Sequence, residues 1–279
     1  MPINPLGSSG SDFEGYIESW KGFEAAMEAL QNMQINSSTQ IDIAFASFEF
    51  DDAGNLKGLE MSQADLKKLV DYIHSKGGKV KLSFGGATYP LGPSLDKLGS
   101  QKLADDIANI VSKLGLDGID LDIEDGNFDA QKAIDFIHDL RKDMPDKLIS
   151  LTVPGQAGVP PFSTLIPGVK NDVDTFNFME YDIWPGDDFV DQIEKDIQQY
   201  MSMWGISSKQ IHLGLMPGKD DMGHQLSPED AMKLAKWAKS QNLGGVMIWD
   251  LNRDSEDISG QGSMIYTHDI EDILFGNSK

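Results

Sequence analysis

The sequence predicts a (β/α)8 barrel, the fold of the TIM barrel enzymes, and two patterns support this class. Eight short runs rich in β-branched and aromatic residues recur along the chain, and amphipathic stretches lie between them. Eight strands that alternate with helices over roughly 250 residues are typical of a closed parallel barrel. A doubly wound open sheet is the alternative, but no glycine fingerprint for phosphate follows the first run. We therefore expect one α/β domain.

The expected elements follow from composition and from the turn residues that bound them. The eight strands are expected at 13–20, 41–50, 79–86, 115–124, 147–155, 175–184, 210–218 and 244–251. Three helices have clear limits, because caps favour glycine at the end and Ser-Pro at the start. They are expected to end on Gly77 and Gly115 and, for the helix that begins with Ser-Pro-Glu at Ser227, on Gly244. The segment between the seventh and eighth strands is short, which predicts no inserted α+β subdomain.

The composition narrows the possible partners. The chain has 279 residues, a formal net charge of −22 and no cysteine. This charge disfavours nucleic acid and anionic lipid, since phosphate binding needs clustered Lys and Arg. It suits solubility, or a neutral or cationic ligand. The lack of cysteine excludes disulfides, thiol catalysis and cysteine-based metal sites. No run of eighteen apolar residues exists, so we expect no membrane span.

The first residues differ in character from the rest. Residues 1–12 are expected to form a flexible leader, and residues 13–279 the barrel. The N-terminal stretch has neither a basic region nor an apolar region, so no secretory signal peptide is expected in this chain. A barrel of this size can stand alone, and we expect a monomer.

The stretch "LDGIDLDIED" (116–125) combines acidic and aliphatic residues. Side chains alternate across a strand, so Asp120, Asp122 and Glu124 share one face and the aliphatic residues between them share the other. The aliphatic face can pack on the helix layer, and the acidic face must then point into the barrel. Glu124 lies at the carboxyl end of this strand, where barrel enzymes place their chemistry. Asp117 has the opposite parity and is expected to support the start of the strand.

Three carboxylates on one inward face cannot all ionise cheaply, because like charges and a low dielectric raise at least one pKa. A Glu that stays protonated near neutral pH can act as a general acid. A Mg²⁺ or Ca²⁺ site is the alternative, since three carboxylates can also hold a hard cation. A purely structural role conflicts with the cost of burying unpaired charge.

Several motifs carry a resemblance to a known family. "DGIDLDIE" (117–124) resembles the D-G-x-D-x-D-x-E signature of glycoside hydrolase family 18, the chitinases and their relatives. "SFGG" (83–86) is similar to the S-x-G-G of the family, and "MEYD" (179–182) to its M-x-Y-D. Trp249 stands where the family has a tryptophan under the bound sugar. The resemblance spans about residues 13–275.

The resemblance implies retaining hydrolysis of β-1,4-linked N-acetylglucosamine, as chitin or chito-oligosaccharides, with assistance from the substrate. The acetamido oxygen of the substrate would attack the anomeric carbon. Glu124 would protonate the leaving oxygen and then activate water. Asp122 would orient the acetamido group, and Asp120 would share the proton of Asp122. No metal or other cofactor is implied.

The resemblance also implies substrate contacts. Tyr181 offers a hydroxyl to the acetamido oxygen, and Trp249 offers a face on which a pyranose stacks. The other expected substrate-binding residues are Met179, Asp182, Tyr16, Phe45 and Gln156. Met179 and Tyr181 share a strand face, whereas Asp182 needs a twist or bulge to reach the sugar. Packing into the barrel core is the alternative for the aromatic residues.

Two other functions stay open. One is an endo-β-N-acetylglucosaminidase that cuts N-glycan cores with the same acids. The other is a catalytically silent, glycan-binding member, but such relatives typically lose the catalytic Glu or the Asp before it, and this chain keeps both. Asp125 and Glu180 depart from the residues common at their positions. Lack of the α+β insertion predicts an open cleft, which favours endo-type cleavage or short oligomers. The substrate class favours an extracellular site of action.

Overall fold

A closed barrel of eight parallel strands forms the centre of the structure, a computed structural model that describes residues 11–51, 54–184 and 188–276. The strands are β1 (Asp12–Glu18), β2 (Thr39–Ala46), β3 (Lys79–Gly85), β4 (Gly118–Asp122), β5 (Leu148–Pro154), β6 (Thr175–Met179), β7 (Ile211–Leu215) and β10 (Gly245–Ile248). Their order around the barrel is β1-β10-β7-β6-β5-β4-β3-β2, and β2 pairs with β1 to close it. The predicted fold class is confirmed.

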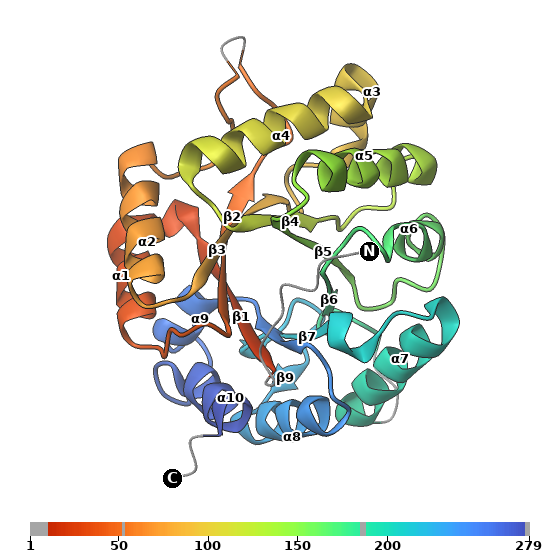
Figure 1. The fold of residues 1–279 in the computed structure, drawn as a ribbon. Helices are drawn as coiled ribbons and strands as arrows, with labels where there is room; N and C mark the ends of the chain where they lie inside the picture. Colours follow the sequence, from red (N-terminus) through yellow and green to blue (C-terminus); the bar gives the residue numbers. More distant parts are fainter. Residues whose placement is uncertain (1–10, 52–53, 185–187, 277–279) are drawn as a thin grey trace.

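Helices surround this barrel as an outer ring (Figure 1). They are α1 (Gly22–Gln31), α2 (Gln63–Ser75), α3 (Leu91–Leu98), α4 (Ser100–Leu114), α5 (Ala130–Asp143), α6 (Phe162–Val169), α7 (Phe189–Trp204), α8 (Pro228–Ser240), α9 (Leu251–Ser255) and α10 (Ile265–Phe275). The outward faces of the strands pack against the ring, and Ile119, Leu121 and Ile123 of the β4 region belong to this main core. No helix in the described ranges has the length and apolar composition needed to cross a membrane.

Between β7 and β10 the described chain contains only a short ribbon and α8. The ribbon pairs β8 (Gly218–Lys219) with β9 (Gln225–Leu226) in antiparallel fashion. The prediction of a single domain without an inserted subdomain is therefore confirmed. At the N-terminus, β1 begins at Asp12, one residue before the expected start of the barrel, and residues 1–10 of the expected leader lie outside the described residues.

Some element ends differ from the predicted ones. The fourth and sixth strands end at Asp122 and Met179, earlier than predicted, so the functional residues beyond them lie in loops. The predicted stop of α8 at Gly244 is wrong, because the helix ends at Ser240 and Asn242 adopts the left-handed conformation, with φ 59°. Gly244 has another purpose, since a Cβ there would lie 2.3 Å from the Lys209 carbonyl oxygen. The predicted end at Gly115 is confirmed: this residue is the C-cap of α4, with φ 69°.

The interior of the barrel holds a buried polar network. The Lys81 ammonium donates to Glu14 Oε1 at 2.7 Å and lies 3.5 Å from Asp42 Oδ1. Asn177 and His212 also hydrogen-bond to the Glu14 carboxylate. Burial by itself would raise the pKa of Glu14, but Lys81 and His212 hold it well below its ordinary value. Glu14 is therefore a buried carboxylate whose ionisation depends on Lys81 and His212.

We expect the substitution Lys81→Met to destabilise the fold strongly. It keeps the volume of the side chain but leaves the Glu14 carboxylate without its ammonium partner. Breaking a buried ion pair in this way costs about 3–5 kcal/mol. Denaturant unfolding measures the effect, with Lys236→Met, an exposed position on α8, as the matched control. An unchanged midpoint for Lys81→Met would show that the ion pair contributes nothing.

Stability should also fall as the pH rises from about 5 to about 8. Glu271 on α10 is buried, its Oε1 accepts from the Gln34 N–H at 2.9 Å, and burial raises its pKa to about 8. The folded chain therefore holds a proton that the unfolded chain releases above the ordinary pKa of a Glu, so stability is lost as the pH rises. Asp250, whose pKa burial raises to about 7, acts in the same direction. Each pKa unit between the unfolded and folded values is worth about 1.4 kcal/mol, and each 1 kcal/mol lost lowers the melting temperature by roughly 2–4 °C.

Thermal melts across this pH range measure the trend. Glu271→Gln keeps an acceptor for Gln34 and removes the ionisation, so its melting temperature should decline less between pH 5 and 8 than that of the parent chain. Equal slopes for the two chains would contradict the role of Glu271.

Candidate active site

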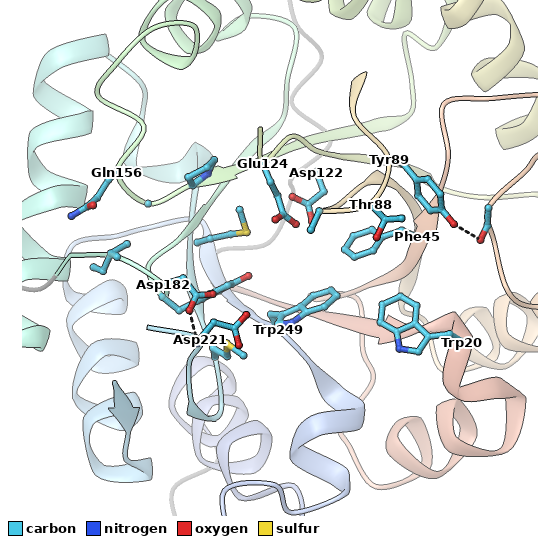
Figure 2. Close-up of a pocket in the computed structure, with 18 of the residues that line it drawn as sticks. Trp20, Phe45, Thr88, Tyr89, Asp122, Glu124, Gln156, Asp182, Asp221 and Trp249 are labelled. Carbon is cyan, nitrogen blue, oxygen red and sulfur yellow. Dashed lines mark hydrogen bonds between the residues drawn. The ribbon is translucent and has the colours of Figure 1, made fainter. Parts of the chain in front are cut away.

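An open cleft of about 630 Å³ lies at the carboxyl ends of the barrel strands, within the size range of ligand pockets. Figure 2 shows Glu124 and Asp122 at its centre, Trp20 on one side of Trp249 and Asp221 on the other. Loops that follow β3, β4, β5 and β6 contribute to its walls. In the described chain, no group of three or more His, Asp or Glu side chains is arranged to hold a metal ion.

Asp122 and Glu124 are placed by the end of β4 and by the neighbouring β3. The carbonyl of Asp122 accepts from the Gly86 N–H at 3.0 Å. A Cβ at Gly85 would lie only 2.0 Å from that carbonyl oxygen, so β3 needs a glycine at this position. Gly85 thus lets β3 approach the acidic strand closely, whereas a Cβ at Gly86 would lie 2.6 Å from the Phe45 ring. Glu124 lies two residues past β4, half-buried and facing the cleft.

Both carboxyl groups favour the protonated form more than a free side chain does. Burial raises the pKa of Glu124, and Asp182 and Asp125 raise it further against an opposing contribution from the Ala87 backbone. Burial also raises the pKa of Asp122 well above its ordinary value, and the charges of Glu124 and Asp120 add to this. Asp122 is 3% exposed, and its Oδ1 has no hydrogen-bond partner among the described residues. That oxygen is itself buried, although the residue lines the cleft.

Asp120 lies deeper and is fully occupied by hydroxyl donors. Its Oδ2 accepts from Tyr16 at 2.8 Å and Ser83 at 2.6 Å, and its Oδ1 accepts from Ser150 at 2.7 Å and Thr152 at 2.8 Å. No hydrogen bond joins Asp120 to Asp122 within the described residues. Hydroxyl groups already take both oxygens of Asp120, and the expected sharing of a proton with Asp122 stays a prediction.

Tyr16 differs from the expectation that it contacts substrate. It is 1% exposed, does not line the cleft, and directs its hydroxyl to Asp120. The strand position is responsible, because Tyr16 lies two residues before the end of β1 and its ring is covered by the edge of Trp249, at 5.4 Å between ring centroids. Tyr16 therefore contacts Asp120 and does not reach the cleft.

Met179, Tyr181 and Asp182, three of the expected site residues, all line the cleft. Tyr181 is largely buried, and burial, together with the charges of Asp122 and Glu124, raises its pKa well above the ordinary value, so it keeps its hydroxyl proton. Asp182 reaches the cleft because its backbone is left-handed, with φ 53°, and not through a strand bulge. Its Oδ1 accepts from the Asp221 N–H at 2.6 Å, which ties it to the β8–β9 ribbon.

Aromatic rings form one wall of the cleft. Phe45 and Trp249 stack with centroids 5.2 Å apart and an angle of 13° between planes. Trp20 lies against both rings, with centroids 6.0 Å from Phe45 at 29° and 6.4 Å from Trp249 at 41°, and is 43% exposed. The wall therefore extends from the carboxylates toward one end of the cleft. At the far side lies Trp184, which is 74% exposed.

Gln156 lines the cleft, but its amide group is already engaged. Nε2 donates to the Trp184 carbonyl at 3.0 Å, and Oε1 accepts from the Trp184 N–H at 3.2 Å. The structure thus gives Gln156 a role in holding the Trp184 backbone, whereas the sequence led us to expect a contact with sugar.

Several residues of the cleft were not identified as site residues from the sequence. They are Trp20, Glu60, Thr88, Tyr89 and Asp221. Glu60, Thr88, Tyr89 and Asp221 lie in loops, where no periodicity indicates direction. For Trp20 a signal existed, because a tryptophan at the carboxyl end of the first barrel strand lies at the end where ligands bind.

Comparisons with known proteins were made on sequence and on structure. The model of "Glycosyl hydrolases family 18" matches residues 12–215. The comparison with curated proteins gives no match. Among solved structures, a family 18 chitinase from Pseudoalteromonas aurantia has a TM-score of 0.75 and 21% identity, covering 94% of this chain and 99% of that one. The catalytic domain of a hyperthermophilic chitinase from Pyrococcus furiosus has a TM-score of 0.73 and 20% identity, covering 100% and 99%.

A third similar structure is a family 18 chitinase from the chitin utilization locus of Flavobacterium johnsoniae. It has a TM-score of 0.72 and 19% identity, covering 95% of this chain and 96% of that one. These structures share the fold over almost the whole length of both chains. Because the family model matches most of the barrel, including its acidic strand, the chain belongs to glycosyl hydrolase family 18 and is a glycosidase.

Proposed function

We propose that this chain hydrolyses β-1,4-linked N-acetylglucosamine, in chitin or chito-oligosaccharides, by a retaining and substrate-assisted mechanism. The observation that carries the proposal is the pair formed by Glu124 and Asp122. Both face one cleft beside a wall of aromatic rings, and both have pKa values raised by burial. The chitinases with the same fold support chitin as the substrate class.

Binding begins at the aromatic wall. A pyranose presents apolar C–H groups on its faces, and these pack on aromatic rings while the hydroxyls stay hydrated. Trp249 lies beside the two carboxyl groups and provides this surface for the reacting sugar (Figure 2). Trp20 and Trp184 extend the contact toward the two ends, so the cleft suits an oligomer more than a single sugar.

Asp122 and Tyr181 hold the acetamido group in this account. The Asp122 carboxylate accepts the N–H of the substituent, and the Tyr181 hydroxyl donates to its carbonyl oxygen. These two contacts place the acetamido oxygen under the anomeric carbon. Orientation of this kind lowers the barrier because the nucleophile is already in position when the bond breaks.

Bond breaking then needs one acid. Glu124 gives its proton to the glycosidic oxygen while the acetamido oxygen forms a bond to the anomeric carbon, and the bond from that carbon to the leaving oxygen breaks. The ring so formed carries a positive charge, which ionised Asp122 stabilises. Ionised Glu124 next takes a proton from water, whose oxygen bonds to the anomeric carbon as the acetamido oxygen leaves. Two inversions give net retention.

Asp120 takes a supporting role in the proposal. Four hydroxyl donors fix its orientation. Its charge adds to the effect of burial and of Glu124 in raising the pKa of Asp122. Phe45, Met179 and Asp182 complete the walls around the reacting sugar. The barrel is expected to act as a monomer, and the substrate class favours an extracellular site.

A product profile tests the proposal against its alternatives. Chitohexaose and an N-glycosylated protein are incubated with the chain in parallel, with and without EDTA. Release of short chito-oligosaccharides, unchanged by EDTA, is the expected result. Release of whole glycans from the protein would identify the endo-β-N-acetylglucosaminidase, and binding of chitohexaose without cleavage would identify a silent member.

A further inference from the structure

We propose that the cleft prefers partially deacetylated chitin, with an N-acetylglucosamine at the reacting position and cationic glucosamine units beside it. The inference rests on the proposed function and adds to it a charge pattern along the substrate. Removal of acetyl groups leaves primary amines, which are ammonium groups at neutral pH. The cleft offers acids where such groups would lie.

The lining of the cleft carries one sign of charge. Among the described residues that line it are five acids and no Lys, Arg or His; the acids are Glu60, Asp122, Glu124, Asp182 and Asp221. A cleft of one sign, with low-dielectric walls, concentrates ligands of the opposite charge. The charge of the whole chain, −22, adds a long-range attraction for a polycation.

Glu60 lies beside the exposed end of the aromatic wall. Its N–H donates to Ser19 Oγ at 3.3 Å, and Ser19 directly precedes Trp20. The nearby Lys21 is engaged with Glu256 at 2.6 Å, and among the described residues no cation pairs with Glu60. A glucosamine that packs on the Trp20 ring would therefore find an available carboxylate next to it.

Asp221 provides a second acid at the opposite side of the cleft. Its N–H donates to Asp182 Oδ1, and this hydrogen bond fixes the backbone at the start of the β8–β9 turn. Figure 2 shows Asp221 and Trp20 on opposite sides of Trp249. Within the described chain no cation pairs with the Asp221 carboxylate. Sugar units on both sides of the reacting one would thus each meet an acid.

The centre of the cleft has the opposite requirement. Asp122 is 3% exposed and lines the cleft, where its carboxylate can accept the N–H of a neutral acetamido group. A glucosamine in this position has no carbonyl oxygen to attack the anomeric carbon. The cleft therefore selects an acetylated unit at the centre, and its flanking acids favour amines on either side.

Hydrolysis rates on two substrates test this inference. The chain is assayed with fully acetylated chitopentaose and with partially deacetylated pentamers. We expect a higher kcat/KM for the deacetylated pentamers, with a ratio that falls severalfold between about 0.01 M and about 1 M salt, where the screening length shrinks from about 30 to about 3 Å. Glu60→Gln and Asp221→Asn should each lower the ratio by about threefold, the size expected for an exposed charge pair.

Mass-spectrometric sequencing of the products locates the preference. New reducing ends should be N-acetylglucosamine, and the units next to the cleaved bond should be enriched in glucosamine relative to the starting pentamers. Glu28→Gln, which removes an exposed charge from α1 outside the cleft, is the control and should leave the ratio unchanged.

The outcomes separate the inference from the function on which it rests. A ratio that is unaffected by salt and by both cleft variants, with chitopentaose still cleaved, would overturn the charge preference alone. Failure to cleave either substrate would overturn the proposed function. Glucosamine at the new reducing ends would contradict the requirement for an acetylated unit at the centre.

Discussion

Glu124→Gln is expected to lower kcat for chito-oligosaccharide hydrolysis by about 10³-fold or more, within the upper range of losses for a general acid. Glutamine has the shape of glutamate but cannot give or take the proton that both steps need. The side chain is half-buried at the cleft, and the change removes one charge from an acidic site, so binding should change by only a few fold. Steady-state rates and calorimetric binding of chitopentaose measure the two effects.

Glu28→Gln is again the matched control, since it makes the same chemical change on the outer ring. Undiminished turnover in Glu124→Gln would remove Glu124 from the mechanism. Loss of binding together with turnover would point to a structural role instead.

Asp122→Asn is expected to lower kcat by about 10²–10³-fold, the range seen when a group that stabilises transition-state charge is removed. Asparagine can still accept the acetamido N–H but carries no negative charge for the cationic intermediate. The residue is buried beside Asp120, and its loss of charge relieves repulsion there, so the fold should be retained. Near-unchanged KM with reduced kcat is the expected signature.

The release of nitrophenolate from an aryl chitobioside distinguishes the effects of the two substitutions. Nitrophenolate leaves without protonation, so Glu124→Gln should still release one equivalent rapidly before the water step stalls. Asp122→Asn should show no such burst, because the first step loses the negative charge that stabilises the cationic intermediate. The same burst in both variants would contradict the separate roles.

The repeating pattern of strands and helices was enough to predict the barrel, since alternation and strand number reflect local composition. Parity on the fourth strand also predicted correctly that Asp120 and Asp122 face inward. The pattern could not show that hydroxyls from three other strands surround Asp120. Such contacts depend on the register between strands that are distant in the sequence.

The loops limited prediction of the site. Asp182 reaches the cleft through a left-handed backbone that the Asp220 and Asp221 segment stabilises from 38 and 39 residues away. Gln156 was expected to contact sugar, but the hydrogen bonds to Trp184 use its amide. The buried polar network inside the barrel was not predicted either, although the positions of Glu14 and Lys81 in their strands direct both side chains inward. The role of each of these two residues can be recognised only when its partner on another strand is known.

The central claim is that the acetamido group of the substrate is the nucleophile. A series of aryl chitobiosides with acetyl, fluoroacetyl and difluoroacetyl groups on the reacting sugar tests it most directly, because fluorine withdraws electrons from the carbonyl oxygen. The account predicts that kcat falls steeply with each added fluorine. Equal rates across the series would contradict it and would require another nucleophile in the cleft.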